Sequence, residues 1–94
     1  MKTIWKFPLR VDDEQVIEIP MQAQTLPIQM QRGIPCFWAL VDTAWPRVRA
    51  KIYTVGTGHS ITFDVYATNY LGSYQLADGG LVFHVFIGDG EATT

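Results

Sequence analysis

The residues of this 94-residue chain that could do chemistry gather around one basic segment and the turn that follows it. On a β-strand successive side chains point to opposite faces, so Arg47, Arg49 and Lys51 form one basic row. Glycines in the following turn allow positive φ, and consecutive turn amides can form a concavity that binds anions. The pattern predicts an anion-binding site, and its residues would be Arg47, Arg49, Lys51, Gly56, Thr57, Gly58 and His59.

Both histidines and one tryptophan extend this prediction. His59 suits acid-base chemistry or an anion, or as an alternative a bond to the local backbone of its turn. His84 is expected on the mixed face of the last hairpin, either as a ligand-binding residue or bonded to Ser73. Trp45 lies in a loop beside Pro46 and is expected to be exposed. An exposed ring can stack on a nucleobase or anchor a protein interface.

The sequence offers little support for catalysis or for a metal. One cysteine and two histidines supply too few ligands for a zinc site, and we predict no metal and no cofactor. Cys36 lies in the most apolar segment, where a thiol is usually inert. No P-loop, dinucleotide fingerprint or G-x-S-x-G motif occurs. We therefore predict binding rather than an enzyme, and assign no catalytic residue.

Composition limits the partners. With 48% hydrophobic and 17% charged residues in 94, we expect one compact domain with more apolar surface than a monomer hides, hence a homo-oligomer. The net charge of -2 gives no global attraction to bulk nucleic acid or to a membrane. A second basic row, Lys2, Lys6 and Arg10, could converge with the first on one anion. Alternatively, both rows are solvated and protect strand edges.

Alternating and β-branched segments recur along the chain, which predicts an all-β fold: a compact antiparallel sandwich or barrel of about seven strands. The domain would span residues 1–87, and residues 88–94 would fray. The first two strands are expected to form a hairpin. Residues 26–30 would form an edge strand because they include Pro27, and residues 36–41 a strand covered on both faces. Residues 61–69 fit either a short strand or a packed loop.

The last hairpin is the best-specified element, because Asp78-Gly79 is a strong two-residue turn signal. The turn would set Ala77 opposite Gly80 and fix the pairing of the strands on either side. The expected pairs are Leu76 with Leu81, Gln75 with Val82, Tyr74 with Phe83, Ser73 with His84, Gly72 with Val85 and Leu71 with Phe86.

Several segments together resemble a family of small proteins of unknown function that tailed phages and prophages encode. The matching stretches are residues 1–9, 33–42 and 55–59, with 70–76 and 80–86 of the last hairpin. The resemblance implies a phage origin and a place of action in the host bacterial cytoplasm. It implies no established activity.

Three functions remain open. The first is a phage anti-defence protein that sequesters a nucleotide-derived immune signal without cleaving it, motivated by the basic row, the turn and the aromatic residues. The second is a protein-binding inhibitor or structural module that acts on a host or phage protein through an apolar sheet face. The third, an enzyme that uses His59 and His84, has the least support in the sequence.

Overall fold

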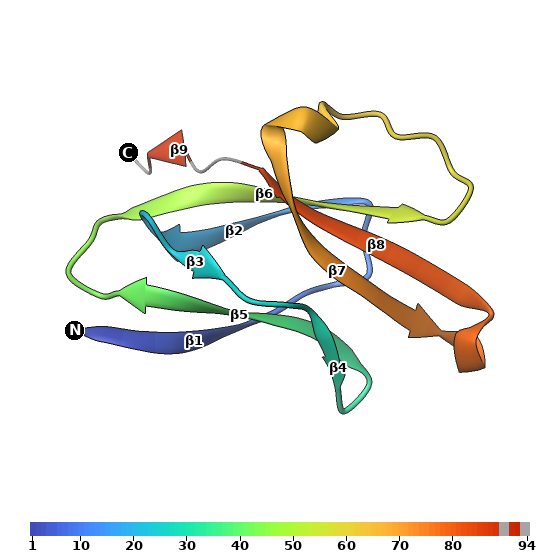
Figure 1. The fold of residues 1–94 in the computed structure, drawn as a ribbon, viewed down its shortest axis with the longest axis horizontal. Coiled ribbons are helices and arrows are strands. Elements are labelled where there is room, and N and C mark those ends of the chain that lie inside the picture. Colours follow the sequence, from blue (N-terminus) through green and yellow to red (C-terminus); the bar gives the residue numbers. More distant parts are fainter. Residues whose placement is uncertain (89–90, 93–94) are drawn as a thin grey trace.

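The computed structural model describes residues 1–88 and 91–92, which form two antiparallel sheets packed face to face (Figure 1). The predicted all-β sandwich is confirmed, and the described residues do not close into a barrel. The first sheet contains β1 (Lys2–Pro8), β5 (Ile34–Asp42), β3 (Gln24–Thr25) and β4 (Gln29–Gln31), with β5 at its centre. The second sheet contains β2 (Glu14–Pro20), β6 (Arg47–Gly56), β8 (Leu81–Gly88), β7 (Thr68–Leu76) and β9 (Glu91–Ala92).

The core lies between the sheets because alternate residues of each strand point inward. Phe37 and Ile52 at its centre have no exposed surface, and the Phe37 ring stacks on Phe7 at 4.9 Å between centroids. Burial of each such side chain stabilises the fold by about 1.5–3 kcal/mol. The other buried members are Leu9, Ile19, Ile28, Ala39, Val41, Val48, Ala50, Leu71, Tyr74, Val85 and Ile87.

The predicted hairpin of the first two strands is wrong, because β1 pairs with β5 in the first sheet and β2 with β6 in the second. Gln15 holds the crossover between them. Its side chain accepts a hydrogen bond from the Arg10 amide at 3.0 Å and donates one to the Arg10 carbonyl at 2.8 Å. Gln15 is buried, so these two bonds offset the cost of placing its amide there.

The expected strand over residues 26–30 is interrupted, and its residues divide between the two sheets. β3 ends at Thr25 and β4 begins at Gln29. Pro27 has no amide hydrogen, and the Ile28 amide donates to the Leu71 carbonyl of β7 at 2.9 Å. Ile28 thus joins the sheets at the side away from β1. Gly72, at φ +124, permits this approach, since a Cβ there would lie 3.0 Å from an Ile28 methyl.

The edge interpretation of the basic rows holds for Lys2 and Lys6, which lie exposed on the edge strand β1, but it is wrong for the row on β6. β6 lies inside the second sheet between β2 and β8, so Arg47, Arg49 and Lys51 do not protect an edge. Lys2 and Lys6 lie on the exposed face of the first sheet, and Arg49 and Lys51 on that of the second. Lys2 and Lys6 therefore point away from Arg49 and Lys51, and the two rows do not converge on one anion.

The prediction for the last hairpin is largely confirmed. Five of its strand pairs, from Leu76 with Leu81 to Gly72 with Val85, occur as expected. The Gly80 amide donates to the Ala77 carbonyl at 2.9 Å, and Asp78 and Gly79 both have positive φ, as in a type I′ turn. One pair is wrong: a bulge between Tyr70 and Gly72 sets Tyr70 opposite Phe86 and turns Leu71 into the core.

Predictions were also made for three other segments: residues 36–41, residues 61–69 and the C-terminal segment. On the outer face of β5, Cys36 is buried but Leu40 is 41% exposed, so this strand is not covered on both sides. Residues 57–67 form a loop that ends in a short 3₁₀ helix, η1 (Val65–Ala67). In the segment expected to fray, Gly88 ends β8 and β9 pairs with Val48 and Arg49, while residues 89–90 and 93–94 lie outside the described residues.

Candidate functional site

A hollow on the outer face of the second sheet brings together part of the predicted site. This hollow, the Lys51 groove, has a volume of about 320 Å³. Gly88 contributes to its floor, where the absence of a side chain leaves space beside Tyr53. Its wall is the returning end of the 57–67 loop. The lining residues are Val16, Arg49, Lys51, Tyr53, Asp64, Ala67, Thr68 and Gly88.

The charges of the Lys51 groove are mixed, because Arg49 and Lys51 line it together with Asp64 in the part of the chain that the structure describes. Lys51 also forms an ion pair with Glu14 at 3.2 Å, in which both side chains are about half exposed. Such pairs contribute little to stability, because solvent screens them. Asp64 caps η1, since its carboxylate accepts a hydrogen bond from the Tyr66 amide at 3.1 Å. The groove can therefore contact an anion at Arg49 and Lys51 and a hydrogen-bond donor at Asp64.

A second hollow, the His59 groove, lies next to the first and shares Lys51, Tyr53 and Asp64 with it. Its volume is about 480 Å³, and Gly56 and His59 line it. Three carboxylates also line it, those of Asp13, Glu14 and Asp64, against the single lysine. An anion is therefore better matched by the Lys51 groove than by the hollow beside the glycine turn.

The glycine turn does not present the free amides that the sequence suggested. The Thr57 amide donates to the Val82 carbonyl at 3.1 Å, and the His59 amide to the Gly56 carbonyl at 3.0 Å. Gly58 supplies the positive φ of the turn, +87°. The His59 ring lies against Gly56, where an added Cβ would come within 3.1 Å of His59 Nδ1. The Thr57 and His59 amides are thus used within the protein, and the exposed His59 side chain is the group of this turn that could contact a ligand.

His84 of β8 links the start of the 57–67 loop to β7. Its Nε2 lies 2.8 Å from Thr57 Oγ1, and its Nδ1 lies 3.2 Å from the Tyr70 hydroxyl. Ser73 is its neighbour across the strands, as predicted, but the ring bonds Thr57 and Tyr70 instead. Both ring nitrogens are therefore engaged in fixing the loop to β8 and β7.

The aromatic residues of this face mostly contact one another. Phe63 of the loop stacks on Tyr53 at 4.2 Å between centroids and meets Phe86 at 5.6 Å. Tyr66 differs, because it lies on η1 beside the Lys51 groove and is 96% exposed. Sequence reasoning missed Asp64 and Gly88, and it counted Tyr66 among the aromatic residues that could stack on a base without placing it beside the basic row. Only Asp64 had a recognisable signal, as an Asp whose side chain can bond the backbone two residues later.

The comparison with known proteins identifies the family. A family model described as a domain of unknown function, DUF7352, matches residues 1–94. The chain belongs to this family. No curated protein and no solved structure matches the chain. The prediction of a family of unknown function is therefore confirmed, whereas the phage origin stays a prediction.

The described residues of this DUF7352 protein were searched for a membrane-spanning helix and for a cluster of metal-binding side chains. Residues 1–88 and 91–92 include no helix long and apolar enough to cross a membrane. The same residues contain no cluster of three or more His, Cys, Asp or Glu side chains placed to hold a metal ion.

Two of the predicted site residues lie far from the turn. β6 has ten residues and is therefore about 30 Å long, with Arg47 at one end and the glycine turn at the other. The Arg47 guanidinium lies over the Trp5 ring, 5.0 Å from its centroid. Trp45 lies just before β6 and belongs to a hollow on the first sheet. The nine predicted residues therefore divide among separate places instead of forming one site.

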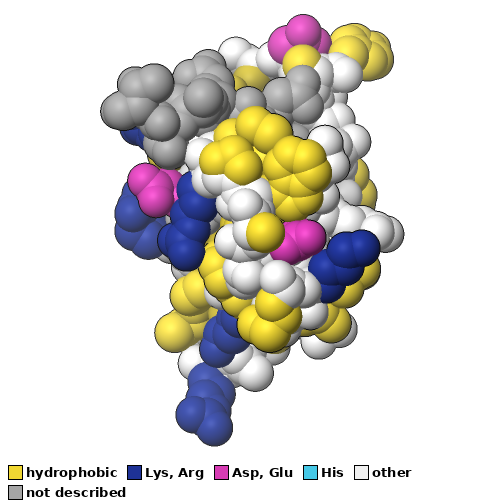
Figure 2. All heavy atoms as spheres, turned by 90° about the vertical axis from the view of Figure 1, so that its left-hand side faces the viewer, with side chains coloured by type: hydrophobic (Ala, Val, Ile, Leu, Met, Phe, Trp, Pro, Cys, Tyr) yellow, Lys and Arg dark blue, Asp and Glu magenta, His cyan; other side chains and the backbone are white. Residues whose placement is uncertain are grey.

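The hollow on the first sheet, the Leu40 groove, is the more apolar surface. Its volume is about 760 Å³, and three large apolar side chains line it: Ile4 is 53% exposed, Leu40 41% and Trp45 43%. Figure 2 views the end of the molecule where the chain begins and shows hydrophobic side chains there among lysines and arginines. An exposed apolar surface of this kind suits contact with another macromolecule.

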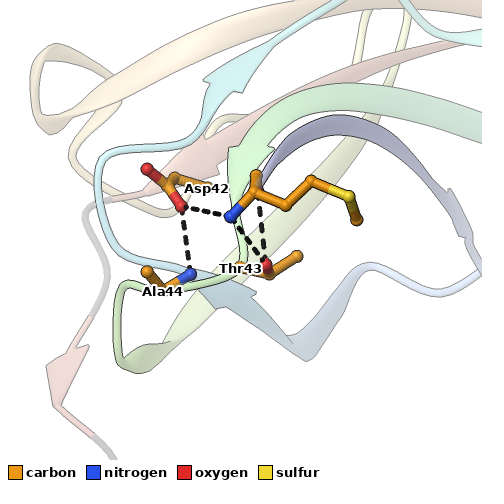
Figure 3. A network of polar contacts seen from close by, with 4 residues as sticks. Asp42, Thr43 and Ala44 are labelled. Atoms are coloured by element: carbon orange, nitrogen blue, oxygen red, sulfur yellow. Dashed lines mark hydrogen bonds and ion pairs between the residues drawn. The ribbon is translucent and has the colours of Figure 1, made fainter.

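The Leu40 groove also contains one ordered polar network (Figure 3). Asp42 accepts a hydrogen bond from the Ala44 amide at 3.0 Å and forms an ion pair with the Met1 ammonium at 3.3 Å. The Ala44 bond is the largest cause of a lowered pKa of the Asp42 carboxyl, followed by the bond to the Met1 ammonium. Asp42 therefore stays ionised and fixes the loop that carries Trp45.

Proposed function

We propose that this protein binds and sequesters a small nucleotide-type anion in the Lys51 groove without cleaving it. The observation that carries the proposal is the placement of Arg49 and Lys51 in one hollow with the acceptor Asp64. Phosphate would contact the two cations, because charge-assisted hydrogen bonds to phosphate are among the strongest available to a protein. An amino group of the base would donate to Asp64.

The size of the hollow and the exposed Tyr66 support this class of ligand. A volume of about 320 Å³ is near the lower end of the roughly 300–1,000 Å³ typical of small-molecule sites. Tyr66 is 96% exposed beside the groove, so its ring is available to stack on a base. The resemblance to phage proteins adds that the ligand would be an immune signalling nucleotide, and the place of action the host bacterial cytoplasm.

Calorimetry with cyclic dinucleotides, ADP-ribose and cyclic ADP-ribose tests the proposal. We expect saturable binding of at least one of them, weakened about 10- to 100-fold by Arg49→Ala or Lys51→Ala because each removes a charge-assisted contact. Arg10→Gln is the control, since Arg10 is an exposed cation paired with Asp12, away from the groove. Chromatography should recover the bound nucleotide intact. The proposal fails if no nucleotide in the panel binds and none is retained from infected-cell lysate.

A second candidate function, a protein-binding inhibitor or structural module, is favoured by the Leu40 groove. Leu40 and Trp45 expose apolar surface that the described residues leave uncovered. A host protein retained in stoichiometric amount by the wild type, and lost with Leu40→Glu, would support this function. Retention that is the same for both proteins would contradict it.

A further inference from the structure

The sandwich has two free strand edges with opposite charge patterns on one of its sides. β1 pairs only through one edge, with β5, and β2 only through one edge, with β6, among the strands that the structure describes. One short crossover joins β1 to β2 and another joins β5 to β6, so β1 lies over β2 at the same side of the molecule (Figure 1). A free edge presents backbone N–H and C=O groups that another strand can pair with.

The outward side chains of these two strands are complementary. Those of β1 are Lys2, Ile4 and Lys6, and those of β2 are Glu14, Val16 and Glu18. The central residues are exposed apolar side chains, Ile4 at 53% and Val16 at 44%. Ile4 and Glu18 lie at the same level of the sandwich, because their partners Leu40 and Arg49 are each two residues from the loop that joins β5 to β6. In antiparallel pairing across a two-fold axis, Ile4 therefore faces Glu18, and Lys6 faces Val16 with Glu14 and Glu18 diagonal to it. Diagonal neighbours on paired strands are about 7–8 Å apart, within reach of long side chains, so opposite charges there attract and like charges repel.

We propose that two copies of this chain form a symmetric dimer in which β1 of each copy pairs with β2 of the other. A two-fold axis parallel to the strands brings the two free edges of one copy against those of the second, β1 to β2 in both layers. Because a short crossover reverses the chain between β1 and β2, the paired strands run antiparallel. Each first sheet then continues into the second sheet of the other copy.

The charges of β6 fit the same arrangement. Glu18 lies across from Arg49, and Glu14 pairs with Lys51 at 3.2 Å. Lysines from the second copy would approach the same carboxylates from the other side, which gives an alternating row of positive, negative and positive side chains. A pairing of β1 with β1 would instead set lysines against lysines and is disfavoured. Charge therefore selects the β1 to β2 arrangement.

The dimer would also complete the Lys51 groove. Val16 lines that groove on the side toward the free edge of β2, so β1 of the second copy would add its lysines at the rim. This consequence rests on the proposed function, since it supplies further positive charge for an anion. The dimer itself does not, and it can be measured in the absence of any nucleotide.

Light scattering of charge-reversal variants tests the dimer. We expect a dimer for the wild type and about a hundredfold weaker association for Lys2→Glu/Lys6→Glu, because symmetry makes each substitution count twice. The Glu14→Lys/Glu18→Lys variant should also be monomeric. A mixture of the two variants should form a heterodimer, since every strand pair is again complementary. A monomeric wild type, or a dimer that tolerates Lys2→Glu/Lys6→Glu, overturns the proposal.

Cross-linking provides a second measurement that does not depend on a glutamate variant that could fail to fold. Opposite residues of an antiparallel pair have Cβ atoms about 4.5–5.5 Å apart, close to the range that a disulfide accepts. Under mild oxidation, Lys6→Cys/Val16→Cys should give a covalent dimer, and Lys6→Cys alone should not. Wild type is the control, since Cys36 is buried. A covalent dimer from Lys6→Cys alone would mean that β1 of one copy pairs with β1 of the other, and would overturn the proposal.

Discussion

The strands of both sheets have alternating sequences, but the outer faces of the two sheets differ in what covers them. On the second sheet, the loop of residues 57–67 folds back so that Phe63 lies on Tyr53 and near Phe86. On the first sheet, the loop between β5 and β6 spans only residues 43–46 and leaves Leu40 and Ile4 exposed. An alternating strand therefore does not reveal whether its outer face is covered. The length and anchoring of the adjoining loop decide it.

This difference has a functional consequence. The covered face has hollows with charged walls, and its loop is held by the stacking of Phe63 on Tyr53 and by the bond of Thr57 to His84. Such a face suits a small ligand whose polar groups must meet defined partners. The uncovered face has large exposed apolar side chains, Ile4, Leu40 and Trp45, and it suits a macromolecule. The two candidate functions thus belong to different faces and can be tested separately.

The strongest test of the difference between the two faces is the loss of stability expected when Phe63 is replaced. Phe63→Ala removes a stacked ring and should lower the free energy of unfolding by about 2 kcal/mol, whereas Leu40→Ala should change it by less than about 0.5 kcal/mol. Urea unfolding of both variants measures the difference. Amide hydrogen exchange of residues 57–67 should also accelerate in Phe63→Ala and not in Leu40→Ala. If Leu40→Ala destabilises the protein as much as Phe63→Ala, the two faces are not covered differently.

The parts of the fold that could be predicted from the sequence are those that local chemistry determines. Asp78-Gly79 fixes the last hairpin, because few residue pairs adopt positive φ so readily. The assignment of β1 and β2 to different sheets could not be predicted, because it depends on a buried Gln15 side chain that bonds the Arg10 backbone. In sequence, Gln15 is only one polar residue of an alternating strand.

The candidate site was predicted only in part, for reasons of distance and of competing hydrogen bonds. Arg49, Lys51 and His59 do line the two hollows of the second sheet. Arg47 and Trp45 were adjacent in sequence to this set but lie near the far end of a strand about 30 Å long. The turn amides were expected to bind an anion, and the donors of Thr57 and His59 instead bond carbonyl groups of the protein. Residues that are close in sequence can lie far apart along a strand. The sequence also does not show which backbone amides already donate hydrogen bonds within the protein.

The smallest effect concerns Asp42, the carboxylate of the uncovered face, and appears only as a pH dependence. Its pKa is lowered below the usual 3.8, so ionised Asp42 contributes stability above that pH and loses it as the pH falls through the folded value. Asp42→Asn retains the oxygen that accepts from the Ala44 amide but lacks the charge that meets the Met1 ammonium. Wild type should therefore be slightly the more stable at neutral pH, and the difference should shrink below pH 3.8. Urea midpoints measured across this pH range, with NMR titration of the Asp42 carboxyl, check the sign. A difference that grows as the pH falls would show that the carboxylate destabilises this loop, and that its network is not what fixes Trp45 beside Leu40.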